Sequence, residues 1–265
     1  MFLIFKRLWQ VNWAEQWQYR ANLFMYLLYW LVSPIIYLAV WTSIANSKGS
    51  VNGFTAGDFV NYYMVLLITD QITSNIVIHT FGYKIQDGTL SGELIRPIHP
   101  MLTNALVNNL AFKALIIMGF TPVWLILTLI FKPDFSAVTW QGVLLAIPAM
   151  MLGFIVGFLL SASITSLAFW TTRVYSIHEF YFALVLLFSG QFVPLTLMPK
   201  LVQDIAQFLP FQLFMYYPIQ LILGKLSSAQ IGQGYIVGLV WLGLSVLLFN
   251  FVWRNGVKQF SAVGA

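Results

Sequence analysis

The acidic residues and histidines of this chain are its best candidates for chemistry, and their placement argues against a catalytic centre. His79, His99 and His178 lie in three different segments, and no H-E-x-x-H motif joins any of them into a metal site. The chain has neither a G-x-x-x-x-G-K-[ST] phosphate loop nor a G-x-S-x-G nucleophile motif. It also has no cysteine, which excludes disulfides and thiolate sites. We therefore expect no catalytic residue, no metal ligand and no cofactor bound by this chain.

Asp70 is the one acid in the middle of a long apolar segment. A carboxylate at the centre of a membrane helix costs about 2.5–3.5 kcal/mol on insertion scales, so Asp70 should face a cavity or polar protein groups. A structural role and a substrate-facing role fit equally well. Lys113 either pairs with Asp70 or snorkels to the cytoplasmic surface; snorkelling is favoured, because residues 114–131 are already long enough to span.

Lipid must be the solvent of the elements that position these residues. Residues 21–47 contain no charged side chain, and similar uncharged runs follow to the end of the chain. The whole chain is 60% hydrophobic and 8% charged, whereas a soluble domain is about 25% charged. A run of about 20 apolar residues spans a bilayer as a helix. The sequence therefore predicts an all-α polytopic membrane protein, with a function performed across or within a membrane.

The charged clusters divide the chain into six transmembrane helices forming one membrane domain over 21–265. The expected spans are about 21–45, 59–82, 108–131, 140–172, 180–198 and 234–253. Residues 1–20 predict an interfacial amphipathic helix, because Trp9, Trp13 and Trp17 recur every four residues. Residues 201–224 contain two prolines and an aspartate, which favours a re-entrant helical hairpin over 199–224, before the last span.

Small residues recur every four positions in two of these spans. Gly153, Gly157, Ser161 and Thr165 follow this spacing in the fourth span, and Gly234-x-x-x-Gly238 repeats it more briefly in the last. Small side chains allow two helices to approach closely. We expect packing against a neighbour in the same chain rather than against a second chain.

Basic residues set the expected orientation. With both termini in the cytoplasm, eight lysines and arginines lie inside and four outside, and all five arginines lie inside. This bias satisfies the positive-inside rule. The net charge of +5 then reflects basic loops at an anionic membrane surface, so membrane lipids are expected partners and nucleic acid is not.

The polar segment 84–100 lies on the predicted cytoplasmic side between the second and third spans. It mixes charged residues with Leu90, Leu94 and Ile95, and it is closed by Pro97 and Pro100. A short helix here would be an exposed handle for another protein. An ordinary solvated loop is the alternative.

Residues 88–97 carry a resemblance to a known family. Their sequence, Gly-Thr-Leu-Ser-Gly-Glu-Leu-Ile-Arg-Pro, resembles the G-x-L-x-x-x-L-[LI]-R-P stretch of type-2 ABC exporter permeases. Residues 188–199, followed by Leu209-Pro210 and Tyr217-Pro218, resemble the fifth-span and re-entrant region of the same permeases. The resemblance covers nearly the whole chain and is closest to the small six-span branch.

The resemblance implies the transmembrane permease subunit of an ATP-driven exporter in a bacterial inner membrane. Such a subunit would move an amphiphilic substrate, such as a lipid, a drug-like molecule or a peptide, out of the cytoplasm. ATP and Mg would be bound by separate ABC ATP-binding subunits, and a second permease chain, identical or paralogous, would complete the pathway. The residues implied to couple to the ATPase are Asp87, Leu90, Glu93, Leu94 and Arg96.

The first, second and fifth spans would line the pathway by the same resemblance, which makes Asp70 a possible pathway-lining counter-charge for a cation. The alternative function is an ion-coupled secondary transporter. That class usually needs coupling carboxylates and often internal repeats, and this chain shows one aspartate within a span and no evident repeat.

Overall fold

The computed structural model describes residues 2–260, except for the side chains of Phe2, His79, Thr80 and Asn104. Within this range the chain is helical and forms no strand; its one isolated bridge joins Val51 and Phe54. The all-α prediction is confirmed. Residue 1 of the predicted interfacial helix and residues 261–265 of the predicted membrane domain lie outside the described residues.

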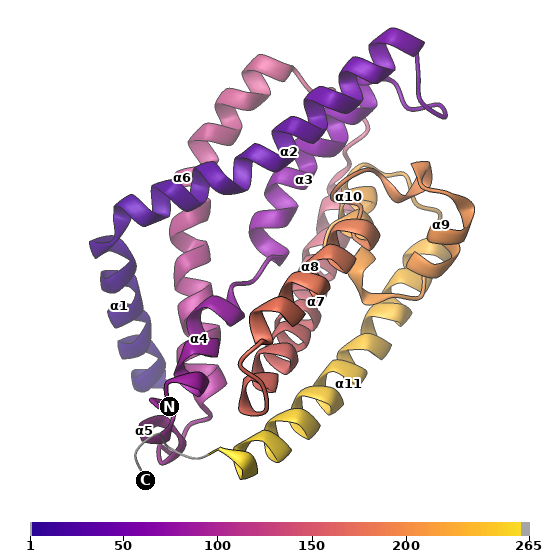
Figure 1. The fold of residues 1–265 in the computed structure, drawn as a ribbon. Coiled ribbons are helices and arrows are strands. Elements are labelled where there is room, and N and C mark those ends of the chain that lie inside the picture. The colour runs from indigo at the N-terminus through magenta and orange to yellow at the C-terminus, as the bar shows by residue number, and fades with distance from the viewer. Residues whose placement is uncertain (1, 261–265) are drawn as a thin grey trace.

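The helices follow one another along the chain as Figure 1 shows. Their bounds are α1 (Phe2–Gln18), α2 (Arg20–Lys48), α3 (Ala56–Thr73), α4 (Val77–Gln86), α5 (Ser91–Leu94), a π-helical turn (Met101–Leu106), α6 (Val107–Phe131), α7 (Trp140–Ser166), α8 (Val174–Phe188), α9 (Lys200–Ala206), α10 (Tyr216–Ile222) and α11 (Ser228–Gln259).

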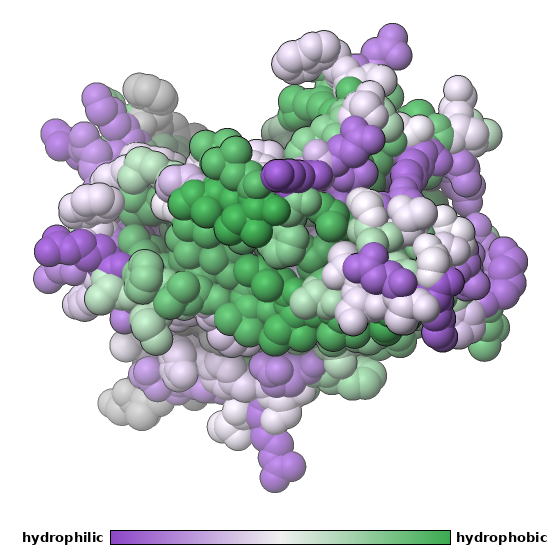
Figure 2. All heavy atoms as spheres, turned by 90° about the horizontal axis from the view of Figure 1, so that it is seen from above, coloured by the Kyte–Doolittle hydropathy of each residue, from purple (hydrophilic) through white to green (hydrophobic). Residues whose placement is uncertain are grey.

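Four of the described helical stretches are long and apolar enough to cross a membrane: Arg20–Lys48, Met101–Phe131, Trp140–Phe169 and Ser228–Gln259. Helix α8 is apolar but shorter. The surface has broad continuous hydrophobic areas, with hydrophilic atoms gathered toward the rim in Figure 2. A water-soluble monomer rarely exposes so much apolar surface, so the helices and the surface together indicate a multi-pass membrane protein.

Several predicted boundaries change in the structure. The second span, expected to run unbroken over 59–82, is divided into α3 and α4 by residues 74–76. The fifth, expected over 180–198, is α8 and ends at Phe188, because Gly190 takes the left-handed φ of +84° that turns the chain away. The third begins at the π-helical turn 101–106, ahead of the expected residue 108.

Helix α7 lies against the 210–222 segment and against α11, and glycines allow the close approach. A Cβ at Gly153 would collide with the carbonyl oxygen of Leu213, and one at Gly142 with that of Leu221. In α11, a Cβ at Gly234 would overlap the Tyr217 ring, and one at Gly238 the Leu152 side chain. The prediction that these small residues pack within the same chain is confirmed.

Residues 189–224 form short helical pieces, as their prolines predict, but whether they re-enter the membrane stays a prediction. Aromatic side chains from the long helices donate hydrogen bonds to carbonyls that these pieces leave free. The Tyr62 hydroxyl donates to the Gly190 carbonyl (2.8 Å), and both the Tyr63 hydroxyl (2.6 Å) and the Trp41 indole (3.0 Å) donate to Phe192. These bonds satisfy two carbonyl groups of the irregular backbone from side chains of the neighbouring helices.

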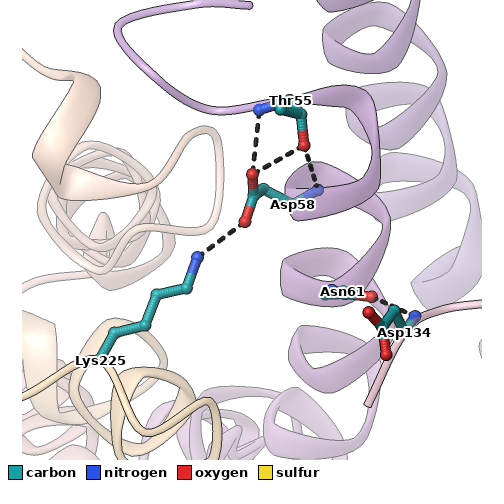
Figure 3. Close-up of polar contacts among 5 residues, drawn as sticks. All are labelled: Thr55, Asp58, Asn61, Asp134 and Lys225. Atoms are coloured by element: carbon teal, nitrogen blue, oxygen red, sulfur yellow. Dashed lines mark hydrogen bonds and ion pairs between the residues drawn. The ribbon is translucent and has the colours of Figure 1, made fainter. Parts of the chain in front are cut away.

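Loops at the end of the molecule opposite α5 meet at the start of α3, as Figure 3 shows. Thr55 and Asp58 form a reciprocal capping box that starts the helix. The other oxygen of Asp58 pairs with the Lys225 ammonium at 2.9 Å. The Asn61 side-chain oxygen accepts a hydrogen bond from the Asp134 backbone N–H at 2.8 Å. One helix start therefore holds the loop after α6 and the loop before α11.

The start of α1, helix α5 and the end of α11 lie together at the other end of the molecule in Figure 1. Helix α1 packs along α6, where the Asn108 side-chain amide donates to the Asn12 side-chain oxygen at 2.8 Å. The helix expected within residues 1–20 is therefore present. Its place in the membrane interface and the cytoplasmic side of both chain ends stay predictions.

Candidate functional site

A cavity of about 280 Å³, open on one side, is lined by α2, the end of α3, the start and middle of α8, and Gln191, Phe214 and Met215. Its described polar lining comes from Ser33, Asp70, Thr73, Ser74, Asn75, His178, Glu179 and Gln191. Its described aromatic lining comes from Tyr26, Tyr29, Trp30, Tyr37, Tyr181, Phe182 and Phe214. An apolar cavity with a few converging polar groups is the usual form of a small-molecule site.

Asp70 reaches this cavity from the last turn of α3. The residue is only 4% exposed, yet it belongs to the cavity lining. The neighbouring hydroxyls are used within the helix, since Thr69 donates to the Val65 carbonyl and Thr73 to the Thr69 carbonyl, both at 2.9 Å. The structure thus places at a cavity wall the acid that the sequence singled out.

Lys113 does not snorkel, so the favoured interpretation of this residue was wrong. It is 8% exposed, and its ammonium donates to the Gln71 carbonyl (2.9 Å) and the Ser74 hydroxyl (3.3 Å). The ammonium also lies 5.3 Å from the centroid of the Phe154 ring. Helix α6 and the turn before it begin early enough to carry Lys113 inside the bundle, where it attracts Asp70 electrostatically without a direct ion pair between them in the described structure.

The break at 74–76 explains why a buried cation is tolerated there. The last carbonyls of α3 have no partner further along the helix, and a helix C-terminus carries partial negative charge. Lys113 supplies donors to Gln71 and Ser74 at this point, while the Ser74 N–H closes the last turn on the Asp70 carbonyl (3.0 Å). Lys113 therefore acts as a side-chain cap for α3.

The polar segment 84–100, which contains the residues proposed to contact an ATPase, forms a compact turn at the end of α4 that we call the elbow. Its residues do not all face outward. Leu90 is fully buried, so its side chain does not project as an exposed handle would require, and its role in coupling stays a prediction. Leu90 packs in one cluster with Phe81, Phe158 and Trp253. Burial in this cluster is favourable because it removes the apolar side chain from water. This cluster ties the elbow to α7 and to the end of α11.

The other elbow residues divide into an inner and an outer set. Glu93 pairs with Lys84 at 2.7 Å, and its side chain is only 13% exposed, so it closes the elbow rather than projecting from it. Leu94 is half-buried against the same cluster as Leu90. Asp87 and Arg96 are exposed, and Ile95, which was not among the predicted contacts, is 86% exposed.

A comparison with protein families decides the identity of the chain. Residues 23–264 match the family described as ABC-2 family transporter protein. The chain belongs to the ABC-2 transporter family. This family assignment makes it a membrane permease component and not the ATPase, and it implies association with an ABC ATP-binding subunit. A comparison with individual curated proteins gives no match.

The cavity of this ABC-2 permease is lined by α2, α3 and α8, which correspond to the expected first, second and fifth spans. These are the spans that the resemblance implied would line the pathway. Sequence reasoning found Asp70 but missed Glu179 and Gln191 as lining residues. Glu179 falls between the expected spans 140–172 and 180–198, although it lies in the helix α8. Gln191 is uncharged, and no spacing in the sequence distinguishes it.

Proposed function

We propose that this ABC-2 permease exports an amphiphilic molecule from the bacterial cytoplasm, paired with a second permease chain. The energy comes from hydrolysis of ATP, which separate ATP-binding subunits hold together with Mg. The observation that carries the proposal is the family match over 23–264, which covers every element around the cavity. The aromatic and polar lining suits a molecule with both apolar and polar parts.

The elbow is the proposed contact with the ATP-binding subunit. Ile95 projects almost fully from it, with the exposed Asp87 and Arg96 nearby in the sequence. An exposed apolar side chain beside charges suits an anchor entering a partner's cleft. The buried Leu90 transmits movement of this contact into the cluster shared with α7 and α11. The pair of permeases then shifts between two states that ATP binding favours unequally.

The test is co-purification with an ABC ATP-binding subunit, followed by vanadate-sensitive ATPase activity and ATP-driven transport in proteoliposomes. Ile95→Glu should weaken association about tenfold or more, because it removes an apolar anchor and places a charge at the contact. Leu201→Glu is the matched control: Leu201 is 71% exposed and lies in α9, away from the elbow. It should retain association.

Two results would contradict the proposal. Equal association of the Ile95→Glu variant and the wild-type permease would remove the elbow from the contact. Transport by the purified permease driven only by an ion gradient would indicate the secondary-transporter alternative instead.

A further inference from the structure

The charges around the cavity have one predominant sign. Asp70 and Glu179 both lie in the described lining, which includes no lysine or arginine. The nearest buried cation, Lys113, lines a smaller neighbouring cavity and is held by the Gln71 carbonyl and the Ser74 hydroxyl. Even when Lys113 is counted, the acids exceed the fixed cations by one. A negatively charged guest would therefore meet repulsion from two carboxylates.

The walls of the cavity add a second preference for positive charge. Tyrosine, tryptophan and phenylalanine contribute to its lining, with Tyr29, Trp30 and Tyr37 on α2 and Tyr181 and Phe182 on α8. Aromatic faces carry negative potential and attract an organic cation, most strongly where water is excluded. The same rings bury apolar groups. This aromatic lining therefore suits a cation that carries hydrophobic substituents.

An unpaired acceptor completes the lining. Gln191 is 9% exposed, and its side-chain oxygen Oε1 is buried without a hydrogen-bond partner in the described structure. A buried acceptor without a donor is costly. Asp70, also buried, accepts no side-chain hydrogen bond and forms no ion pair among the described residues. The cavity therefore holds more acceptor capacity than the described chain itself uses, and a positively charged guest would satisfy it.

We propose that the cavity binds a hydrophobic organic cation, with Asp70 and Glu179 as counter-charges and the rings of α2 and α8 as walls. This inference rests on the proposed transport function and narrows its substrate class. A lipid or peptide without positive charge would leave the two carboxylates unmatched. His178 also lines the cavity, with its ring 5.9 Å from that of Tyr181, and it supports the wall beside Glu179.

Binding to the purified full-length permease in nanodiscs tests the inference without an ATPase. Tetraphenylphosphonium and tetraphenylborate have nearly the same shape and opposite charge. Equilibrium dialysis of each ion, corrected for partition into empty nanodiscs, gives its specific binding. Saturable binding of tetraphenylphosphonium at least about tenfold tighter than that of tetraphenylborate is expected, because the two carboxylates attract the cation and repel the anion at close range. Equal or tighter binding of tetraphenylborate would overturn the inference.

Two variants locate the binding site. Asp70→Asn and Glu179→Gln each remove one charge at nearly constant size, and each should weaken tetraphenylphosphonium binding about tenfold. Glu179 is exposed, so its variant keeps the inference testable if Asp70→Asn fails to fold. Asp204→Asn removes the same charge from an exposed site in α9, outside the lining, and should bind like the wild type. Unchanged binding in both cavity variants would refute the assignment.

The complex with an ATP-binding subunit separates this inference from the proposed function. ATP-driven transport or permease-dependent ATPase activity without tetraphenylphosphonium binding would leave the function intact and remove the cation site. Cation binding by a permease that no ATP-binding subunit joins would keep the site and remove the function.

Discussion

Gly153→Ala should destabilise this permease at the contact between α7 and the 210–213 turn. The new Cβ would meet the Leu213 carbonyl oxygen and lie 3.0 Å from the Leu213 carbonyl carbon. Both are backbone atoms, so no flexible side chain can move aside, and either α7 or the turn must shift. Overpacking of this kind costs about 1–3 kcal/mol.

Gly243→Ala is the matched control, because a Cβ at Gly243 has nothing within 4 Å and Gly243 also lies inside a long helix. Replacing glycine by alanine in a helix gains about 1 kcal/mol of propensity. That gain applies to both variants, so it cancels in the comparison, and the difference between them reports the packing cost alone.

Thermal unfolding of the purified protein in detergent, followed by loss of the monodisperse chromatographic peak, measures this difference. At about 2–4 °C per kcal/mol for a chain of this size, the midpoint of Gly153→Ala should lie roughly 2–12 °C below that of Gly243→Ala. Equal midpoints would refute the reasoning, since they would mean that the turn yields to a methyl group without cost.

Two further predictions concern the outer segment and the loops. Tyr62→Phe should lower the free energy of unfolding by about 1–3 kcal/mol in thermal or denaturant melts, because the fully buried Tyr62 hydroxyl donates to the Gly190 carbonyl; Tyr29→Phe, at a side chain 74% exposed, should change nothing. Burial alone would raise the pKa of Asp58, just ahead of the predicted span, but hydrogen bonds from Lys225 and Thr55 outweigh it and lower that pKa. A lowered pKa means stability that is present above the unfolded pKa of about 3.9 and lost as the pH falls through the folded value. Melts at pH 6 and pH 3 should therefore show a larger loss for the wild type than for Lys225→Met, by at most about 1 kcal/mol because both side chains are partly exposed; identical losses would exclude the ion pair as a source of stability.

The long apolar helices could be predicted from the sequence because length and missing charge are enough to define them. Helix α2 extends only from Arg20 to Lys48, close to the expected 21–45, since charged residues bound it on both sides. The packing glycines could also be recognised, because their four-residue spacing is a property of one helix. Both features depend on local sequence alone.

Features that depend on contacts between distant segments could not be predicted. The segment Ser74-Asn75-Ile76 contains neither proline nor glycine, so its sequence does not indicate a break in the second span. The break is explained only by the structure, in which Lys113 of α6 caps α3. Leu90 lies among polar residues and reads as a surface position, but Trp253, more than 160 residues later, provides the core that buries it. For the same reason the aromatic walls on α2 and α8 could not be assigned to one cavity.

The interruption at 74–76 divides the second span into two helices that can move as separate units. Helix α3 is held to the outer loops by the ion pair of Asp58 and the hydrogen bond of Asn61. Helix α4 instead packs in one cluster with the elbow and the end of α11. A movement of the elbow would reach the outer loops along this span only through residues 74–76, next to which Lys113 caps α3. Asp70 lies beside this break and lines the cavity. A molecule bound in the cavity would therefore be placed to respond to the angle between α3 and α4.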